Sequence, residues 1–311
     1  MKSTSSRTRL LGAVLILVGL PAVLAVSAAV SSHVRNRNNG SIVSSGRKRE
    51  YLLYVPRSYD RSKPTPLVIS MHGAGGWPTQ QRNLTEWNRL AESERFIVVY
   101  PSGIEAGGPR VWHVSRDPGL TSDVRFISEL IDKLETAYNI DPARIYANGF
   151  SNGGGMAFVL SCTLSDRIAA VGMVGAAQTL PWSWCADRRA VPLISFHGTA
   201  DPMALYKGGE SWVAPAPFPS VLTWTASWAR RNRCRPDPVD SAVAADVTRR
   251  EYGNCADHAD VVLYTVHGGG HQWFGGQALP AWFVGPDNRT IDATRQMWAF
   301  FRDRRLVKGG S

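Results

Sequence analysis

The chain has 311 residues, 44% of them apolar, which is enough for one large α/β domain with a sizeable core. Its formal net charge is +10, but no nucleic-acid-binding motif accompanies that charge, so we expect no nucleic-acid partner. The 11 tryptophans are many for this length. Tryptophan often lines clefts that take sugars, aromatic rings or acyl chains, although burial in the core is its commoner use.

An uncharged apolar segment, Leu10–Val30, follows three basic residues and precedes a polar stretch. We interpret residues 1–30 as a signal peptide or, since the segment is long enough to span a bilayer, as an N-terminal membrane anchor. Any membrane attachment would run through residues 10–30. Residues 31–47 are interpreted as a polar linker and residues 48–308 as the catalytic domain. This domain is therefore expected outside the cytoplasm, either secreted or membrane-anchored.

Four cysteines agree with an oxidising compartment, and they allow three pairings. We predict Cys162–Cys185 and Cys234–Cys255, because each bond closes a short loop and would stabilise the fold by about 3 kcal/mol. Four unpaired buried thiols are the alternative. The cysteines contain no Cys-x-x-Cys spacing, and we expect no metal site.

Apolar runs and amphipathic runs alternate along the chain. The predicted strands are Arg49–Val55 (an edge strand), Leu67–Met71, Phe96–Tyr100, a strand that begins at Ile145 and runs into the turn at Gly149, Ala169–Val174, Leu193–His197 and Val261–Val266. The predicted helices are Thr79–Glu94, Asp123–Tyr138, Met156–Leu164, Val221–Arg231 and Ile291–Leu306. This alternation predicts an α/β protein whose central sheet is mostly parallel, with helices on both faces.

The most informative stretch is a buried strand that runs into Gly149-Phe-Ser151-Asn-Gly153 and then a helix. Gly-x-Ser-x-Gly in this setting is typical of the nucleophile elbow of an α/β-hydrolase, with Ser151 at its apex. Side chains at either flanking glycine would clash in so sharp a turn. The backbone N–H of Asn152, at the start of the helix, could stabilise an oxyanion. The alternative is a glycine-rich surface turn.

A second glycine-rich turn, His72-Gly-Ala-Gly-Gly76, follows an earlier buried strand. α/β-Hydrolases place the other half of the oxyanion hole at this point. The N–H of Ala74 is the first candidate donor and that of Gly73 the second. An ordinary strand-to-helix turn is the alternative.

The candidates for the acid and the base come later in the chain. Asp201 follows the second strand after the nucleophile, where the orienting carboxylate is expected, although a turn-forming Asp-Pro is the alternative. Two histidines compete for general base. His271 lies on a glycine-rich loop, whereas His267 ends a strand and is interpreted as structural. The order Ser151, Asp201, His271 is that of the α/β-hydrolases.

Three tryptophans are candidate substrate contacts. Trp77 follows the second glycine-rich turn, Trp112 lies in the Gly/Pro-rich loop Ser102–Gly119, and Trp273 lies two residues after His271. We interpret His113 as an ordinary loop histidine. The Trp/Pro-rich loop Gly208–Pro219 is expected to shape the rim of the pocket.

Together these segments resemble the secreted esterases of the polyhydroxybutyrate depolymerase and feruloyl esterase group (carbohydrate esterase family 1-like, with the LpqC-type proteins). The matching pieces, spread over about residues 48–303, are Tyr51–Pro56, His72–Gly76, Asp123–Ile127, Gly149–Gly154, His197–Pro202 and Gly268–Trp273. The resemblance implies Ser151 as nucleophile, Asp201 as acid and His271 as base, and it supports both disulfides. Arg125 stands where this group usually has glycine, and Phe274 where proline usually follows the tryptophan.

The expected function is hydrolysis of carboxylic esters through an acyl-enzyme, without a cofactor or metal. The substrate would be a feruloyl or acetyl ester of a polysaccharide, or a short hydroxyalkanoate polyester, and the protein is expected to be a monomer. Three alternatives remain open. They are an envelope acyltransferase related to the mycolyltransferases, a serine peptidase of the same fold, and a non-catalytic envelope binding protein.

Overall fold

The computed structural model describes residues 38–105, 109–116, 118–214 and 216–306. The predicted export segment lies outside these residues. Within the described ranges, no helix has the length and apolar character needed to cross a membrane.

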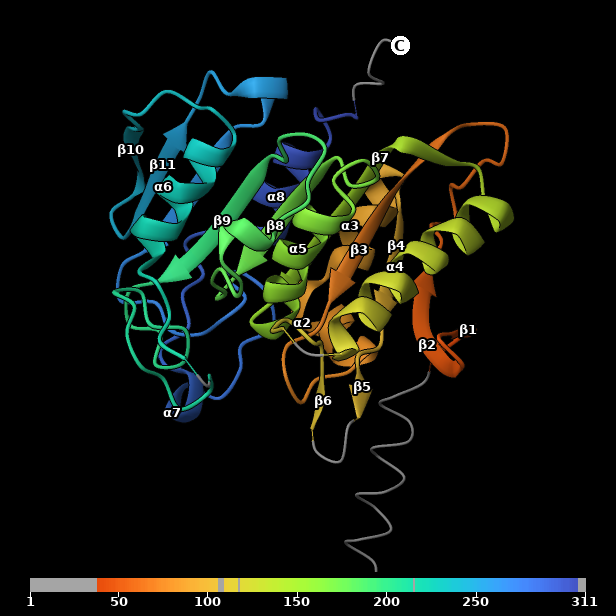
Figure 1. The fold of residues 1–311 in the computed structure, drawn as a ribbon, viewed down its shortest axis with the longest axis horizontal. Coiled ribbons are helices and arrows are strands. Elements are labelled where there is room, and N and C mark those ends of the chain that lie inside the picture. The colour runs from red at the N-terminus through yellow and green to blue at the C-terminus, as the bar shows by residue number, and fades with distance from the viewer. Residues whose placement is uncertain (1–37, 106–108, 117, 215, 307–311) are drawn as a thin grey trace, which may run out of the picture. The chain divides into compact units, whose positions relative to one another are not determined.

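A ten-stranded sheet forms the centre of the fold, in the order β1-β2-β4-β3-β7-β8-β9-β12-β11-β10 (Figure 1). The strands are β1 (Gly40–Ser44), β2 (Arg47–Tyr54), β3 (Thr65–Met71), β4 (Ile97–Pro101), β7 (Ile140–Phe150), β8 (Ala170–Val174), β9 (Leu193–Gly198), β10 (Val239–Ala244), β11 (Val247–Tyr252) and β12 (Val261–Val266). The six strands from β4 to β12 are parallel, and antiparallel pairs flank them at both edges. The predicted, mostly parallel sheet is confirmed.

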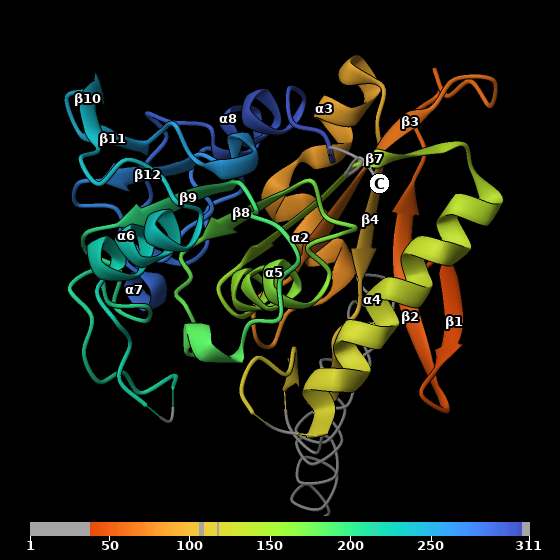
Figure 2. The same ribbon diagram turned by 45° about the horizontal axis from the view of Figure 1, so that its top comes forward.

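Helices cover both faces of this sheet (Figure 2). They are α2 (Pro78–Thr85), α3 (Trp87–Glu94), α4 (Pro118–Ala137), α5 (Asn152–Thr163), α6 (Val221–Arg231), α7 (Ala281–Val284) and α8 (Ala293–Phe301). Alternate strand residues serve opposite faces: Leu67 and Ile69 of β3 pack in the core under α4, α5 and α6, whereas Val68 packs in the core under α2, α3 and α8. Parallel strands buried on both faces account for the uninterrupted apolar runs in the sequence.

The N-terminal edge of the sheet differs from the prediction. The strand predicted as Arg49–Val55 corresponds to β2, which is not an edge strand, because β1 pairs with it on the outside. β1 lies in the stretch predicted to be linker, so the sheet begins before residue 48. Its short, polar sequence, Gly-Ser-Ile-Val-Ser, carries little apolar pattern from which a strand could be inferred.

The predicted helix Thr79–Glu94 is two helices, α2 and α3. They are separated at Glu86, which adopts a left-handed conformation with φ 53° and ψ 22°. The last carbonyls of α2 bond to distant partners: the Leu84 carbonyl accepts from Gln277 N, and the Thr85 carbonyl accepts from Thr294 Oγ1. These long-range bonds replace the continued helix.

Other predicted element boundaries differ from those in the structure, and some elements were not predicted. The loop 102–119 contains a small hairpin of β5 (Ile104–Glu105) and β6 (Arg110–Val111), and α4 begins at Pro118 rather than Asp123. The hairpin of β10 and β11 was not predicted, because β10 is exposed over nearly its whole length and has no alternating apolar pattern. Helix α6 and strand β12 have the predicted bounds.

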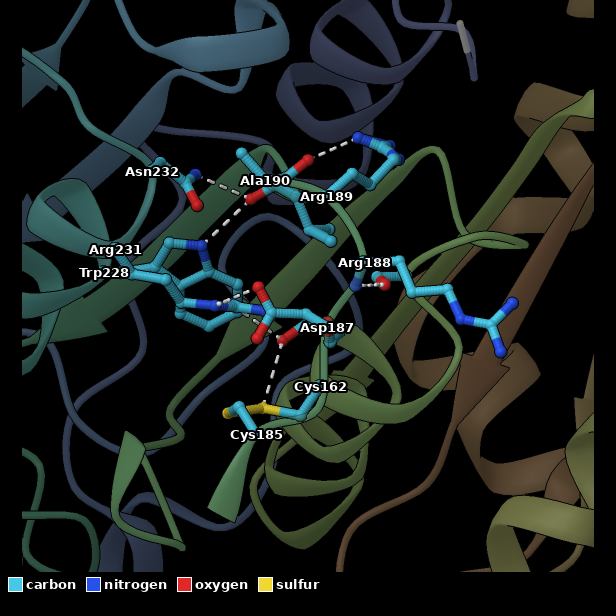
Figure 3. Close-up of polar contacts among 12 residues, drawn as sticks. Cys162, Cys185, Asp187, Arg188, Arg189, Ala190, Trp228, Arg231 and Asn232 are labelled. Atoms are coloured by element: carbon cyan, nitrogen blue, oxygen red, sulfur yellow. Dashed lines mark hydrogen bonds and ion pairs between the residues drawn. A yellow bond between two sulfur atoms is a disulfide. The ribbon is translucent and has the colours of Figure 1, made fainter. Parts of the chain in front are cut away.

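Both predicted disulfides are present. Cys162 of α5 pairs with Cys185 of the loop that follows β8, and Cys234 pairs with Cys255. Figure 3 shows the surroundings of the first disulfide, where Arg231 of α6 reaches Asp187 with an Nε–Oδ2 distance of 3.2 Å. Trp228 Nε1, also in α6, donates to the Val191 carbonyl at 2.9 Å. The loop after β8 is thus fixed to both α5 and α6.

Candidate active site

Ser151 occupies the turn between the central strand β7 and helix α5. Its φ of 53° and ψ of −119° are unusual for a residue with a side chain. The flanking glycines are needed for close approach: a β-carbon on Gly149 would lie 2.2 Å from the backbone of Gly153, and one on Gly153 would lie 2.2 Å from the Met71 carbonyl oxygen. The predicted elbow is therefore present, and it packs directly on the end of β3.

Two neighbouring parallel strands bring the predicted glycine-rich turns together. Met71, at the end of β3, is paired with Gly149 of β7, so the chain leaves both strands at one edge of the sheet. A β-carbon on Gly73 would lie 3.4 Å from the β-carbon of Ser151. The turn His72–Gly76 thus lies beside the Ser151 side chain.

Asn152 begins α5, and as the first helical residue its N–H has no acceptor within the helix. Its side chain holds the neighbouring loop: Oδ1 accepts from the Trp112 N–H at 2.7 Å, and Nδ2 donates to the Trp112 carbonyl at 3.0 Å. The Ser151 N–H donates to the Val174 carbonyl at 2.9 Å. These bonds fix the backbone on both sides of the serine.

His271 and Asp201 form a buried pair on the loops after β12 and β9. His271 Nδ1 donates to Asp201 Oδ2 at 2.8 Å. The other oxygen, Oδ1, accepts from the N–H groups of Met203 and Ala204 at 2.8 and 2.9 Å. Because an ionised carboxylate only accepts, the imidazole proton sits on Nδ1 and leaves Nε2 as the basic nitrogen.

The imidazole of His271 lies against the elbow. Its centroid is 4.7 Å from that of Phe150, and a β-carbon on Gly175 would lie 3.0 Å from its Nδ1. Phe150 directly precedes Ser151, and Gly175 directly follows the Val174 carbonyl that holds the Ser151 N–H. In the described part of the chain, no hydrogen bond joins the Ser151 hydroxyl to the imidazole. Such contacts often tighten only when substrate binds.

His72 is a residue whose role the sequence reasoning missed. Its Nδ1 donates to the Gly73 carbonyl at 2.8 Å, and its Nε2 accepts from the Gly103 N–H at 3.0 Å. The Gly73 carbonyl also accepts from the Gly76 N–H at 3.0 Å. In a trans peptide the N–H points opposite to the carbonyl, so these bonds set the direction of the Ala74 N–H. The signal in the sequence was the position of His72 at the start of the turn.

Burial lowers the pKa of His72 to about 4 and keeps the imidazole neutral. An unfolded chain would bind the proton near pH 6.5, so the unfolded state holds more protons between these two values. The free energy of unfolding is therefore expected to fall by about 3 kcal/mol as the pH drops from 7 to below 4. Urea unfolding at pH 7.0 and 4.5 measures the larger part of this loss.

The variant His72→Asn is the control for this pH dependence. It should show a smaller loss, although not none, because burial also lowers the pKa of His197. Equal losses in the variant and the wild type would contradict the assignment to His72.

A second His–Asp pair, in which the carboxylate is buried and the imidazole partly buried, anchors the loop next to the elbow. Asp123 Oδ2 lies 2.8 Å from His113 Nδ1, and Asp123 Oδ1 lies 2.8 Å from the guanidinium of Arg49. His113 adjoins Trp112, whose backbone is bonded to Asn152. His113, which we predicted to be an ordinary loop histidine, thus helps to support the elbow.

The three predicted tryptophan contacts have different surroundings. Trp112 is 2% exposed, its ring lies against His72, and its Nε1 donates to the His72 carbonyl at 3.1 Å. Trp273 is 1% exposed, and its Nε1 donates to Thr294 Oγ1 at 2.9 Å. Both are core side chains here, which favours a structural role over substrate contact. Trp77 occupies the position before α2, where its side chain makes no capping hydrogen bond, and it is half-buried.

His267 and His271 are four residues apart, a spacing that can hold a metal, but they have different partners. His267 Nε2 lies 2.9 Å from Thr248 Oγ1 on β11, away from the Asp201 pair. No cluster of three or more metal-binding side chains occurs among the residues with described positions. The assignment of His271, rather than His267, to the pair with Asp201 agrees with this geometry.

The parallel sheet, the serine elbow after a central strand and the His–Asp pair on later loops define the α/β-hydrolase fold. The fold matches that of an acetyl xylan esterase from Aspergillus awamori with a TM-score of 0.59 at 16% identity, over 75% of this chain and 93% of that chain.

Sequence comparison then gives the family. The Esterase family profile matches residues 42–275, and the chain belongs to this family. It is 30% identical over 229 residues to feruloyl esterase B of Piromyces equi, covering 72% of this chain and 42% of that protein. It is 28% identical over 275 residues to feruloyl esterase D of Neurospora crassa, covering 83% and 87%. The chain thus spans less than half of the first relative.

Proposed function

We propose that this protein is a serine hydrolase of carboxylic esters, acting on feruloyl or acetyl esters of polysaccharides. The observation that carries the proposal is the buried pair of His271 and Asp201, with 2.8 Å between Nδ1 and Oδ2, packed against the strained turn at Ser151. Membership of the Esterase family supports the ester bond as the target. The feruloyl esterases among its relatives support the class of substrate.

In the proposed reaction, Ser151 Oγ attacks the ester carbonyl while His271 Nε2 takes its proton. Asp201 stabilises the imidazolium that forms. The N–H groups of Asn152 and Ala74 stabilise the tetrahedral oxyanion, each contributing a few kcal/mol. The alcohol leaves with the proton from His271. Water then attacks the acyl-enzyme by the same route, which releases the acid and restores the serine.

The compartment and the assembly belong to the proposal as well. The two disulfides support a catalytic domain that works in an oxidising space outside the cytoplasm. Residues 1–30 would deliver it there, either as a cleaved signal or as an anchor, and the domain would act as a monomer on a polymeric substrate.

A panel of substrates tests the proposal. We expect hydrolysis of methyl ferulate and of p-nitrophenyl acetate, and covalent labelling of Ser151 by a fluorophosphonate. A sugar ester formed from an added sugar acceptor would instead indicate an acyltransferase, and an amide cleaved as fast as its ester would indicate a peptidase. Turnover of hydroxybutyrate oligomers alone would move the substrate class to polyesters. A folded protein that neither cleaves nor labels would be a binding protein.

A further inference from the structure

A group of large aromatic side chains lies in solvent. Trp282 is 87% exposed, Trp212 is 70% exposed, and Phe283 is 49% exposed. The Phe283 ring centroid lies 6.0 Å from that of Trp212 and 5.6 Å from that of Trp282, so the three form one surface. All 11 tryptophans have described positions, and only these two are largely exposed. Contiguous exposed aromatic area usually marks a binding site.

Both halves of this aromatic surface are built on the loops of the candidate site. Phe283 is next to Val284, whose carbonyl accepts from the backbone N–H of His271 at 2.6 Å. Trp212 is next to Ser211, whose hydroxyl donates to the Met203 carbonyl at 2.6 Å.

Met203 in turn donates its N–H to Asp201 Oδ1. Figures 1 and 2 show α7, which carries Trp282 and Phe283, beyond the end of β9. The aromatic surface is therefore continuous with the loops that hold the His–Asp pair.

The chemistry of the surface indicates a neutral ligand. Residues 211–219 and 279–286 contain no charged side chain. A surface that binds anionic membranes or single-stranded nucleic acid normally adds Lys or Arg to its aromatic residues. Sugar rings, in contrast, present apolar C–H faces that pack flat on the rings of Trp and Phe, and their hydroxyl groups remain in water.

We propose that Trp212, Trp282 and Phe283 bind the neutral glycan chain that carries the ester. This inference rests on the proposed function for the ester itself, whereas glycan binding needs no catalysis. A chain seated on this surface would bring its ester groups to Ser151, because the surface and the His–Asp pair share the same loops. Small soluble esters would not use it.

Binding is tested with insoluble, de-esterified xylan, measured as depletion of the protein from solution. Wild type and Ser151→Ala should be retained alike, whereas the double variant Trp212→Ala/Trp282→Ala should bind about tenfold more weakly. Trp282→Phe, which keeps an aromatic ring, should retain most of the binding. The matched controls are Val43→Ala and Val239→Ala, at apolar positions that are 75% and 67% exposed elsewhere on the surface.

Kinetics give the second readout. The double variant should lose about tenfold in kcat/KM on feruloylated arabinoxylan, chiefly through KM, and change less than about twofold on methyl ferulate. The proposal is overturned if xylan does not retain the wild type, or if the double variant binds xylan as the wild type does. It is also overturned if the double variant keeps its binding to xylan but loses binding to phosphatidylglycerol vesicles. A wild type that binds xylan but cleaves no ester would refute the proposed function alone.

Discussion

Replacing Ser151 by alanine is expected to lower kcat for methyl ferulate by about 10⁴-fold or more, with no loss of fold. The reason is that Ser151 Oγ is the proposed nucleophile and no other hydroxyl is placed at the apex of the elbow. The pair of His271 and Asp201 is bonded to backbone groups independently of the serine, so its geometry should survive the substitution. Steady-state kinetics and urea unfolding of the same preparations measure both parts.

Ser151→Gly separates catalysis from backbone strain. A side chain at φ 53° and ψ −119° is strained, and glycine removes that strain. Ser151→Gly should therefore be as inactive as Ser151→Ala but more stable than it by about 1 kcal/mol. Alanine and glycine variants of equal stability would show that the turn stores no strain, and activity near that of wild type in either variant would remove Ser151 from the mechanism.

Much of the geometry of the candidate site could be predicted because its signals are local. The elbow depends on the two glycines that flank Ser151, and all three lie within one stretch of five residues. Asp201 follows a strand that the sequence shows as an uninterrupted apolar run. The choice of His271 over His267 needed only the observation that one lies on a glycine-rich loop and the other at a strand end.

What the sequence could not reveal depends on distant contacts. Trp112 and Trp273 read as pocket residues because they adjoin motif residues, but their indole N–H groups are bonded to the His72 carbonyl and to Thr294 inside the core. The break at Glu86 likewise follows from bonds to residues some 200 positions later in the chain. A local sequence pattern does not show which distant residues will bond to these groups.

The exposed aromatic surface shows the same limit. Trp212 and Phe283 are far apart in the sequence, and the loop 208–219 alone predicted only a pocket rim. Their contact arises because each segment is bonded to a different loop of the site, one through Met203 and one through His271. The tertiary fold thus brings together two segments rich in Trp and Pro, neither of which predicts the surface alone.

Replacing Asp201 by asparagine is expected to lower kcat by about 10²- to 10⁴-fold with little change in KM. The carboxylate has two tasks: Oδ1 accepts hydrogen bonds from two backbone N–H groups, and Oδ2 accepts a hydrogen bond from His271 Nδ1. An asparagine that keeps Oδ1 in place turns its NH₂ group toward Nδ1. His271 must then carry its proton on Nε2, so that Nε2 can no longer accept the proton of Ser151. An asparagine in the opposite orientation loses both backbone bonds.

Asp123→Asn is the matched control, since Asp123 of α4 is also buried and also bonded to a histidine, and that histidine, His113, lies in the loop next to the elbow. It should cost more stability than Asp201→Asn, by about 3 kcal/mol, because it leaves the buried Arg49 without its anionic partner. Its kcat, measured well below its unfolding temperature, should fall by less than about tenfold. If the two variants lost kcat equally, we would conclude that Asp201 acts only by supporting the loops of the site. A selective loss in Asp201→Asn would tie the carboxylate to the tautomer of His271, and hence to proton transfer from Ser151.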